Sequence, residues 1–220
     1  MPEAAVASRI LPTRDTPPQP VRRRHAKSQR RWDLIVEASI ALFKERGFAA
    51  TSMQDISDRV GLQKGSLYYY VTSKEMLLFE ILRDLHRGGE ALVDHINFET
   101  SDPLGELRSY FVQIGIYSGR HADRLGIFAR DFHFLGSTQQ DEIIRERFMY
   151  RRATEQLVQL AIDKGQVSAS IDVQSAAQTM LRAVTATYEW YRPGGHLAIE
   201  QIAVQSAAIL VQGLAAFGRS

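Results

Sequence analysis

The sequence predicts an all-α protein, and three observations lead to that prediction. Apolar residues recur at helical spacing from about residue 27 onward. No alternating strand pattern bounded by hairpin turns occurs anywhere. Gly119, Gly136, Gly165 and Pro193 separate the later periodic segments. A chain of 220 residues is long enough for a small module joined to a larger helical domain. We expect about nine helices.

The composition excludes several classes of site. The absence of cysteine excludes disulfides, thiolate metal sites and a cysteine nucleophile. No apolar stretch approaches the roughly 20 residues that a membrane helix needs. The first residues also lack the uninterrupted apolar core of a secretory signal. These features favour a cytoplasmic protein without a membrane partner.

Residues 1–26 are expected to form a disordered basic tail. Five of the seven prolines lie in the first twenty residues, with no apolar period among them. Residues 1–31 hold eight basic and two acidic side chains, so the remainder of the chain is net acidic. This asymmetry indicates a polyanion-binding end on an acidic body. The alternative is a solvated tail that only aids solubility.

The first helix is predicted from about residue 27 to 46, because Ile35, Ala38 and Leu42 form one apolar stripe. A second, short helix starts at Ser52, whose hydroxyl and the carboxylate of Asp55 have capping-box spacing. That helix ends at Gly61, because glycine permits a left-handed turn. A third helix is expected at 64–70 and a fourth at about 73–96.

The second and third helices have the arrangement of a helix-turn-helix, because a three-residue turn that contains Gly61 joins them. In such a motif the later helix can lie in the major groove of DNA. The residues of that helix suit the task, since they offer a charge, a glycine, a hydroxyl and three phenols while Leu67 faces inward. These candidate residues are Lys64, Gly65, Ser66, Tyr68, Tyr69 and Tyr70. Alternatively, Tyr70 is a half-buried residue that packs within the domain and does not contact DNA.

Residues 31–82 resemble the DNA-binding domain of the TetR family of bacterial transcriptional regulators. The matching strings are Glu45-Arg46-Gly47-Phe48, Thr51-Ser52, Gly61, Gly65-Ser66-Leu67-Tyr68 and Ser73-Lys74-Glu75. The chain departs from the family at Tyr70, which is often His, and at Val71, which is often Phe. The resemblance implies phosphate contacts at Ser52, Tyr69 and Lys74. It implies base or backbone contacts at Gln63, Lys64, Ser66 and Tyr68.

Later helices are predicted at about 103–119, 122–135, 139–165, 172–191 and 197–217. We divide the chain into the tail, a DNA-binding domain at 27–74 and a ligand-binding and dimerisation domain at 75–220. The resemblance implies a ligand cavity among the middle helices and a homodimer made by the last two. Alternatively, the apolar residues of these two helices pack within one chain as part of its ordinary core.

The candidate effector is an acyl-CoA thioester. The string from Trp190 to Gly195 resembles the one found in TetR-type repressors of lipid and steroid catabolism that respond to such thioesters. Aromatic residues of the middle helices are candidates for an acyl group, and arginines for the CoA phosphates. The ligand candidates are Tyr117, Phe128, Phe132, Phe148, Arg151, Arg152, Trp190 and Arg192. The alternatives for these residues are core packing for the aromatics, a solvated face for the arginines and carbonyl capping by Arg192. The alternative effector is a drug, a fatty acid or an aromatic acid.

No catalytic, metal or cofactor site is predicted. His121 and Asp123 are two residues apart on predicted helices, so their side chains point to different faces. No Gly-x-Ser-x-Gly, His-Glu-x-x-His or nucleotide-binding loop occurs. We therefore expect a ligand-responsive repressor that binds a palindromic operator and is not an enzyme. A helical scaffold without DNA binding is the alternative from another class.

Overall fold

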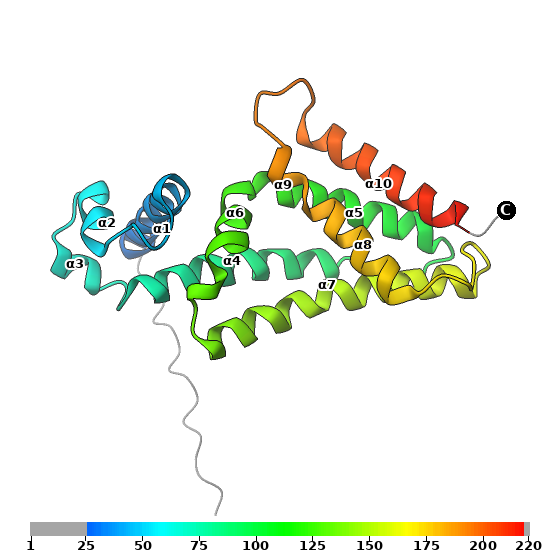
Figure 1. Cartoon of the computed structure of the whole chain (residues 1–220), viewed down its shortest axis with the longest axis horizontal. Helices are drawn as coiled ribbons and strands as arrows, with labels where there is room; N and C mark the ends of the chain where they lie inside the picture. The colour runs from blue at the N-terminus through cyan, green and yellow to red at the C-terminus, as the bar shows by residue number, and fades with distance from the viewer. Residues whose placement is uncertain (1–25, 218–220) are drawn as a thin grey trace, which may run out of the picture.

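The computed structural model describes residues 26–217, and every regular element in that range is a helix, as predicted. Three helices gather at one end, and a long fourth helix leads from them into the larger body (Figure 1). These four are α1 (Ala26–Arg46), α2 (Met53–Val60), α3 (Lys64–Tyr68) and α4 (Lys74–Val93). The body contains α5 (Pro103–Arg120), α6 (Ala122–Asp131), the 3₁₀ helix η1 (Phe132–Phe134), α7 (Ser137–Asp163), α8 (Val173–Thr185), α9 (Thr187–Trp190) and α10 (Ile199–Ala216). The expected tail falls on residues outside this range, except for Ala26.

The local signals that define α2 are confirmed. The Ser52 hydroxyl accepts a hydrogen bond from the Asp55 amide at 3.1 Å, and the Asp55 carboxylate accepts one from the Ser52 amide at 2.7 Å. This capping box satisfies two of the amides that a helix start leaves unpaired. The Ser52 hydroxyl and the Ser52 amide both donate hydrogen bonds to the Asp55 carboxylate, and these bonds lower the pKa of Asp55. Gly61 ends α2 with a φ of 64°, the left-handed conformation that glycine adopts at no steric cost.

The predicted helix 172–191 is divided into α8 and α9 at Ala186. The two flanking threonines give the backbone alternative partners. The Thr185 hydroxyl donates to the Leu181 carbonyl at 2.7 Å, and the Thr187 hydroxyl donates to the Val184 carbonyl at 2.9 Å. Hydroxyl bonds of this kind compete with regular helical bonding. Smaller differences are the end of α3 at Tyr68, the end of α4 at Val93 and the change from α6 to η1 at Phe132.

Two hydrophobic clusters hold the molecule together. The first contains the buried side chains of α1, α2, α3 and the first half of α4, and it also includes Ile127, Leu135 and Ile143 from the body. The second lies among α5, α7, α8 and α10, with Phe111 and Leu157 fully buried in it. The core around the helix-turn-helix therefore takes part of its apolar side chains from α6 and α7.

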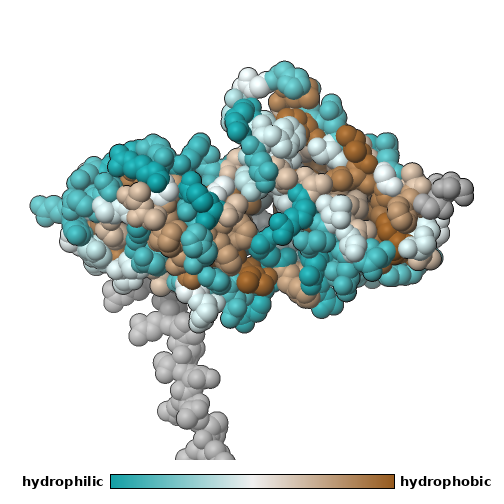
Figure 2. Space-filling view, viewed as in Figure 1, coloured by the Kyte–Doolittle hydropathy of each residue, from teal (hydrophilic) through white to brown (hydrophobic). Residues whose placement is uncertain are grey.

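Helix α10 has a buried apolar side and an exposed side of mixed polarity that includes Val204 and Ile209. Its buried residues follow helical spacing, and they are Ile199, Ile202, Ala203, Ala207, Val211 and Leu214. A Cβ added at Gly115 of α5 would lie 2.9 Å from the Ala203 Cβ, so glycine allows α5 and α10 to approach closely. By length and composition alone α10 would also qualify as a membrane-spanning helix, which differs from our expectation for the sequence. Figure 2 shows apolar side chains over the region of α8 and α10.

Candidate DNA-reading surface and effector site

The outward face of the helix-turn-helix is polar and exposed. Leu67 is fully buried and fixes α3 to the core of the domain. On the other side, the residues from the turn to the end of the motif face solvent. They are Gln63, Lys64, Gly65, Ser66, Tyr68 and Tyr69. We refer to these six residues as the reading face.

The three tyrosines do not share one environment. Tyr69 is 81% exposed and Tyr68 is 43% exposed, so both phenols are accessible to a partner. Tyr70 is half-buried and packs against the first hydrophobic cluster, with its ring 5.4 Å from that of Tyr69. The packing alternative that we gave for Tyr70 therefore matches its position.

Ser52 and Lys74 are both engaged within the protein. The Ser52 hydroxyl takes part in the capping box of α2. The Lys74 ammonium donates to the Phe48 and Thr51 carbonyls at 2.7 Å each and to the Ala49 carbonyl at 3.4 Å. An ammonium has three donors, and these contacts use all of them. The structure thus gives Lys74 a role in holding the turn between α1 and α2, which differs from the phosphate contact that the resemblance implies.

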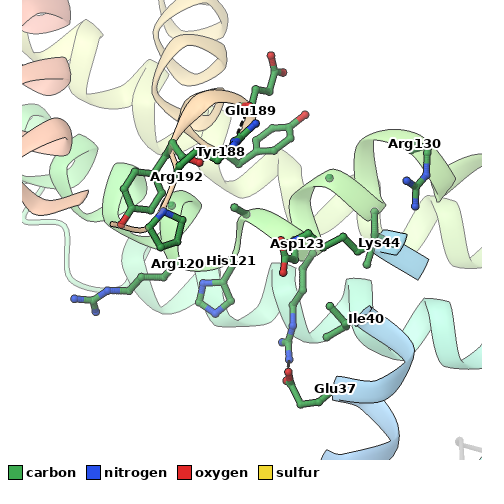
Figure 3. Close-up of a pocket in the computed structure, with 17 residues that line it drawn as sticks. Glu37, Ile40, Lys44, Arg120, His121, Asp123, Arg130, Tyr188, Glu189 and Arg192 are labelled. Carbon is green, nitrogen blue, oxygen red and sulfur yellow. Dashed lines mark hydrogen bonds and ion pairs between the residues drawn. The ribbon is translucent and has the colours of Figure 1, made fainter. Parts of the chain in front are cut away.

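A cleft with a volume of about 730 Å³ lies where α1 meets α6 and the segment around α9 (Figure 3). The second half of α1, the end of α5 and most of α6 supply one part of its wall. The residues from Tyr188 to Pro193 supply the other part. Clefts of this size at domain boundaries are common ligand sites. We refer to this space as the interdomain cleft.

Three polar links cross the interdomain cleft between α1 and α6. Lys44 pairs with Asp123 at 2.8 Å, and Arg124 pairs with Glu37 at 3.2 Å. Arg130 donates to the Phe43 carbonyl near the end of α1 at 2.5 Å.

Arg130 is itself held by its neighbour Asp131. That carboxylate is 3% exposed and accepts hydrogen bonds from Nε and from one Nη of Arg130. Hydrogen bonding to Asp131 raises the pKa of Arg130. α6 is therefore connected directly to the first helix of the DNA-binding half.

The predicted ligand residues lie in different surroundings, and most of them do not line the interdomain cleft. Phe128 and Phe132 pack against the first hydrophobic cluster, with their rings 5.0 Å apart. Phe148 is 43% exposed on α7, where the Arg151 guanidinium lies 4.7 Å from its ring centre. Arg152 also lies over the Phe148 ring, at 5.8 Å. Phe128 and Phe132 are therefore partly buried, whereas Phe148 is exposed on α7.

The remaining candidates lie elsewhere. Trp190 is 55% exposed at the end of α9. Arg192 lines the interdomain cleft and donates to the Glu189 and Tyr191 carbonyls, so the capping alternative also describes it. Tyr117 donates to the Leu85 carbonyl of α4 at 2.6 Å and stacks on His121. Of the eight predicted ligand residues, only Arg192 lines this cleft.

A buried histidine, His86, lies on α4 where that helix packs against the body of the protein. Tyr150 of α7 donates to the carbonyl of His86 at 2.6 Å, next to the contact that Tyr117 makes. The His86 side chain is 6% exposed, and its Nε2 has no hydrogen-bond partner. Burial, with a smaller effect from Arg147, lowers the pKa of His86 to about 3. His86 is therefore neutral at physiological pH.

Sequence reasoning missed the residues that span the interdomain cleft. Glu37 and Arg124 are 87 positions apart, and each occurs on a helix with many other charges. The one usable signal was the concentration of three arginines and a histidine between Arg120 and Arg130. Nothing in that run indicates that α6 packs on α1.

The geometry defines the class of this protein: a helix-turn-helix DNA-binding regulator with a larger helical half attached through α4. Two family models match the chain. Residues 35–81 match the bacterial regulatory proteins of the tetR family, and residues 100–214 match the tetracyclin repressor-like C-terminal domain. The chain belongs to the TetR family of transcriptional regulators.

Named relatives agree with this assignment. The chain is 30% identical over 216 residues to the HTH-type transcriptional repressor KstR2 of Rhodococcus jostii, covering 91% of this chain and 98% of that protein. The solved ketosteroid regulator KstR2 of Mycobacterium tuberculosis has a TM-score of 0.76 at 29% identity, over 84% of this chain and 94% of that one. AibR, solved with isovaleryl coenzyme A and operator DNA, has a TM-score of 0.71 at 25% identity, over 82% and 98%. These relatives are transcriptional regulators and not enzymes.

Proposed function

We propose that this protein is a repressor that binds a palindromic operator as a homodimer and leaves it when a small effector binds. The reading face is the observation that carries the proposal. It is polar, exposed and supported from behind by the buried Leu67. A face of this kind on the second helix of a helix-turn-helix suits the major groove. Within it, Lys64 supplies positive charge and Tyr68 and Tyr69 supply phenols.

The homodimer is supported by the uncovered side of α10. Ile209 is 70% exposed and Val204 is 48% exposed, although both are large apolar residues on a regular helix. Large apolar side chains that are exposed on a regular helix are typical of protein interfaces. A second copy that places its own α8 and α10 against this surface would cover it with two-fold symmetry.

The proposed effector is an acyl-CoA thioester. The string from Trp190 to Gly195 and the cationic residues of the interdomain cleft support it. AibR, whose structure contains isovaleryl coenzyme A, is similar to this chain in both sequence and fold. A non-CoA hydrophobic ligand is the second candidate, because the body is rich in apolar side chains and Phe148 and Trp190 are partly accessible. It would leave the cationic residues of the cleft without a contact to the ligand.

A gel shift on the DNA that flanks the protein's own coding region tests the DNA-binding part. We expect a shift that Tyr69→Ala weakens strongly, since stacking and hydroxyl contacts at an exposed tyrosine are lost. Leu34 is also exposed, but it lies on α1 away from the reading face, so Leu34→Ala is the matched control. Equal binding by both variants would remove the reading face from the proposal.

Light scattering tests the dimer. The parent chain should have twice the monomer mass at micromolar concentration, and Ile209→Glu should shift it towards the monomer, because a charge is then buried without a partner. Ile144→Glu is the matched control, since Ile144 is 52% exposed on α7. A monomeric parent chain would overturn the homodimer.

Release of operator DNA tests the effector. The operator complex is titrated with acyl-CoAs of increasing chain length and with the matching free acids. Release requires that the ligand bind the DNA-free form better than the DNA-bound form. We expect release by thioesters only. Equal release by the free acids would favour the second candidate.

A further inference from the structure

The lining of the interdomain cleft contains more cations than carboxylates. Its cationic residues are Lys44, Arg120, Arg124, Arg130 and Arg192, and its carboxylates are Glu37, Asp123 and Glu189. Tyr188 and Tyr191 add aromatic surface to the same wall. Cations beside flat rings suit a ligand that has both phosphates and an aromatic base. The cleft volume of about 730 Å³ is within the range of small-molecule sites.

The carboxylates of the two ion pairs that cross the cleft are exposed to water. The Lys44 and Asp123 side chains are 60% and 50% exposed, and in the second pair Glu37 is 69% exposed while Arg124 is 23% exposed. Water and salt screen such pairs, so they contribute little to stability. A phosphate group carries more charge than a carboxylate and accepts paired hydrogen bonds from a guanidinium. Phosphates can therefore take Arg124 and Lys44 from these carboxylates at small cost.

Arg192 faces this space without a carboxylate partner among residues 26–217. One of its terminal nitrogens, Nη1, donates to the Tyr191 carbonyl at 2.8 Å and to the Glu189 carbonyl at 3.1 Å. A guanidinium has five donors, so several remain for a ligand. Figure 3 shows Arg192 and Tyr188 on one side of the cleft, with Lys44 and Asp123 on the other. Cationic groups thus approach the same space from α1, α6 and the α9 segment.

We propose that the interdomain cleft binds the phosphorylated nucleotide end of coenzyme A, and that Arg124 and Lys44 exchange Glu37 and Asp123 for phosphate oxygens when it binds. This inference rests on the proposed acyl-CoA effector and assigns its polar end to a site. The two exchanged pairs both join α1 to α6. Binding therefore replaces contacts between the DNA-binding half and the sensing half, which provides the link between effector and operator.

The first experiment separates the phosphates from the rest of the ligand. Calorimetry on the full chain compares coenzyme A, dephospho-coenzyme A and pantetheine, none of which has an acyl group. The first step removes the 3′-phosphate, and the second removes the pyrophosphate together with the adenosine. We expect affinity to fall in that order, and the salt dependence of binding to fall with it, because each step removes phosphate charge. Equal affinity for all three compounds would overturn the proposal.

Variants in the cleft then test the individual residues. Arg124→Gln should weaken coenzyme A binding about tenfold, as expected for one charge-assisted contact. Asp123→Asn should tighten it about threefold, because Lys44 no longer has a competing partner. The matched control is Arg108→Gln, since Arg108 is exposed on α5 and does not line the cleft. A purely structural role for the ion pair would not produce tighter binding in Asp123→Asn.

The outcomes distinguish this inference from the proposed function. If thioesters release the operator from the Arg124→Gln and Arg108→Gln variants at the same concentration, the effector is correct and the cleft is the wrong site. If neither coenzyme A nor its thioesters bind the parent chain, the effector is wrong and the inference falls with it. Weakening in Arg124→Gln together with tightening in Asp123→Asn supports both.

Discussion

Replacing Lys74 with methionine separates two roles for one side chain. The structure places the Lys74 ammonium 2.7 Å from the Phe48 and Thr51 carbonyls and 4.3 Å from the centre of the Phe48 ring. The resemblance to TetR regulators instead implies a DNA phosphate contact. Methionine keeps the length and the apolar body of the side chain but removes the charge. The structural role predicts a change in the free energy of unfolding, and the phosphate role predicts a change in the salt dependence of operator binding.

The structural role predicts a loss of stability. Hydrogen bonds to a charged group contribute about 1.5–3 kcal/mol, and Lys74 is partly exposed, so we expect the free energy of unfolding to fall by about 2 kcal/mol. For a chain of this length that corresponds to a fall in Tm of about 6 °C. The phosphate role predicts little change in stability and a reduction of about 0.9 per contact in the salt slope of operator binding.

Thermal denaturation and operator titrations at several salt concentrations measure both quantities. Lys64→Met is the matched control, because Lys64 is exposed on the reading face. We expect this control to weaken operator binding while leaving Tm nearly unchanged. If Lys74→Met instead keeps the parent Tm and lowers the salt slope, the carbonyl contacts do not hold the turn and the phosphate role is correct.

Three further changes test the body of the protein. A Cβ at Gly89 would overlap the Tyr150 hydroxyl, so Gly89→Ala should lower the free energy of unfolding by about 1–2 kcal/mol, measured by urea denaturation. Gly126→Ala is the control, because Gly126 has open space around it and the substitution should not lower this free energy. Because burial lowers the pKa of His86 below that of the unfolded chain, its stability contribution is present above about pH 6.5 and is lost as pH falls towards 3. The parent chain should therefore lose about 2 kcal/mol between pH 7 and pH 5 that His86→Gln does not lose. Ile127→Ala should cost about 2–5 kcal/mol of unfolding free energy, since Ile127 is 1% exposed. Equal pH dependence of His86→Gln and parent, or parent-like stability of the other two variants, would contradict these expectations.

The parts of the fold that follow from neighbouring residues could be predicted from the sequence. Ser52 and Asp55 lie three positions apart and specify the start of α2, and Gly61 specifies its end. Leu67 could be placed inward because it shares an apolar pattern with α2. The break at Ala186 could not be predicted, since the hydroxyl bonds of Thr185 and Thr187 become visible only in three dimensions.

The candidate site was predicted less well because its contacts are distant in the sequence. The reading face lies on one short segment, so residue type, helical spacing and, for Gln63, the resemblance to the TetR family were enough to propose it. The interdomain cleft depends on the packing of α6 against α1, and no local sequence pattern indicates such packing. Lys74 shows the same limit, because its carbonyl partners lie 23 to 26 positions before it.

The sharing of the first hydrophobic cluster between the two halves limits how this regulator can be recombined with its relatives. Ile127, Leu135 and Ile143 belong to the same cluster as the buried side chains of the helix-turn-helix, although they lie well beyond the segment that the N-terminal family model matches. A chimera that exchanges only residues up to the middle of α4 would pair this chain's own α6 with a foreign helix-turn-helix core. Such a hybrid would carry cavities or clashes at the joint. Grafting a new operator preference therefore requires α6 and the start of α7 to be exchanged together with the helix-turn-helix.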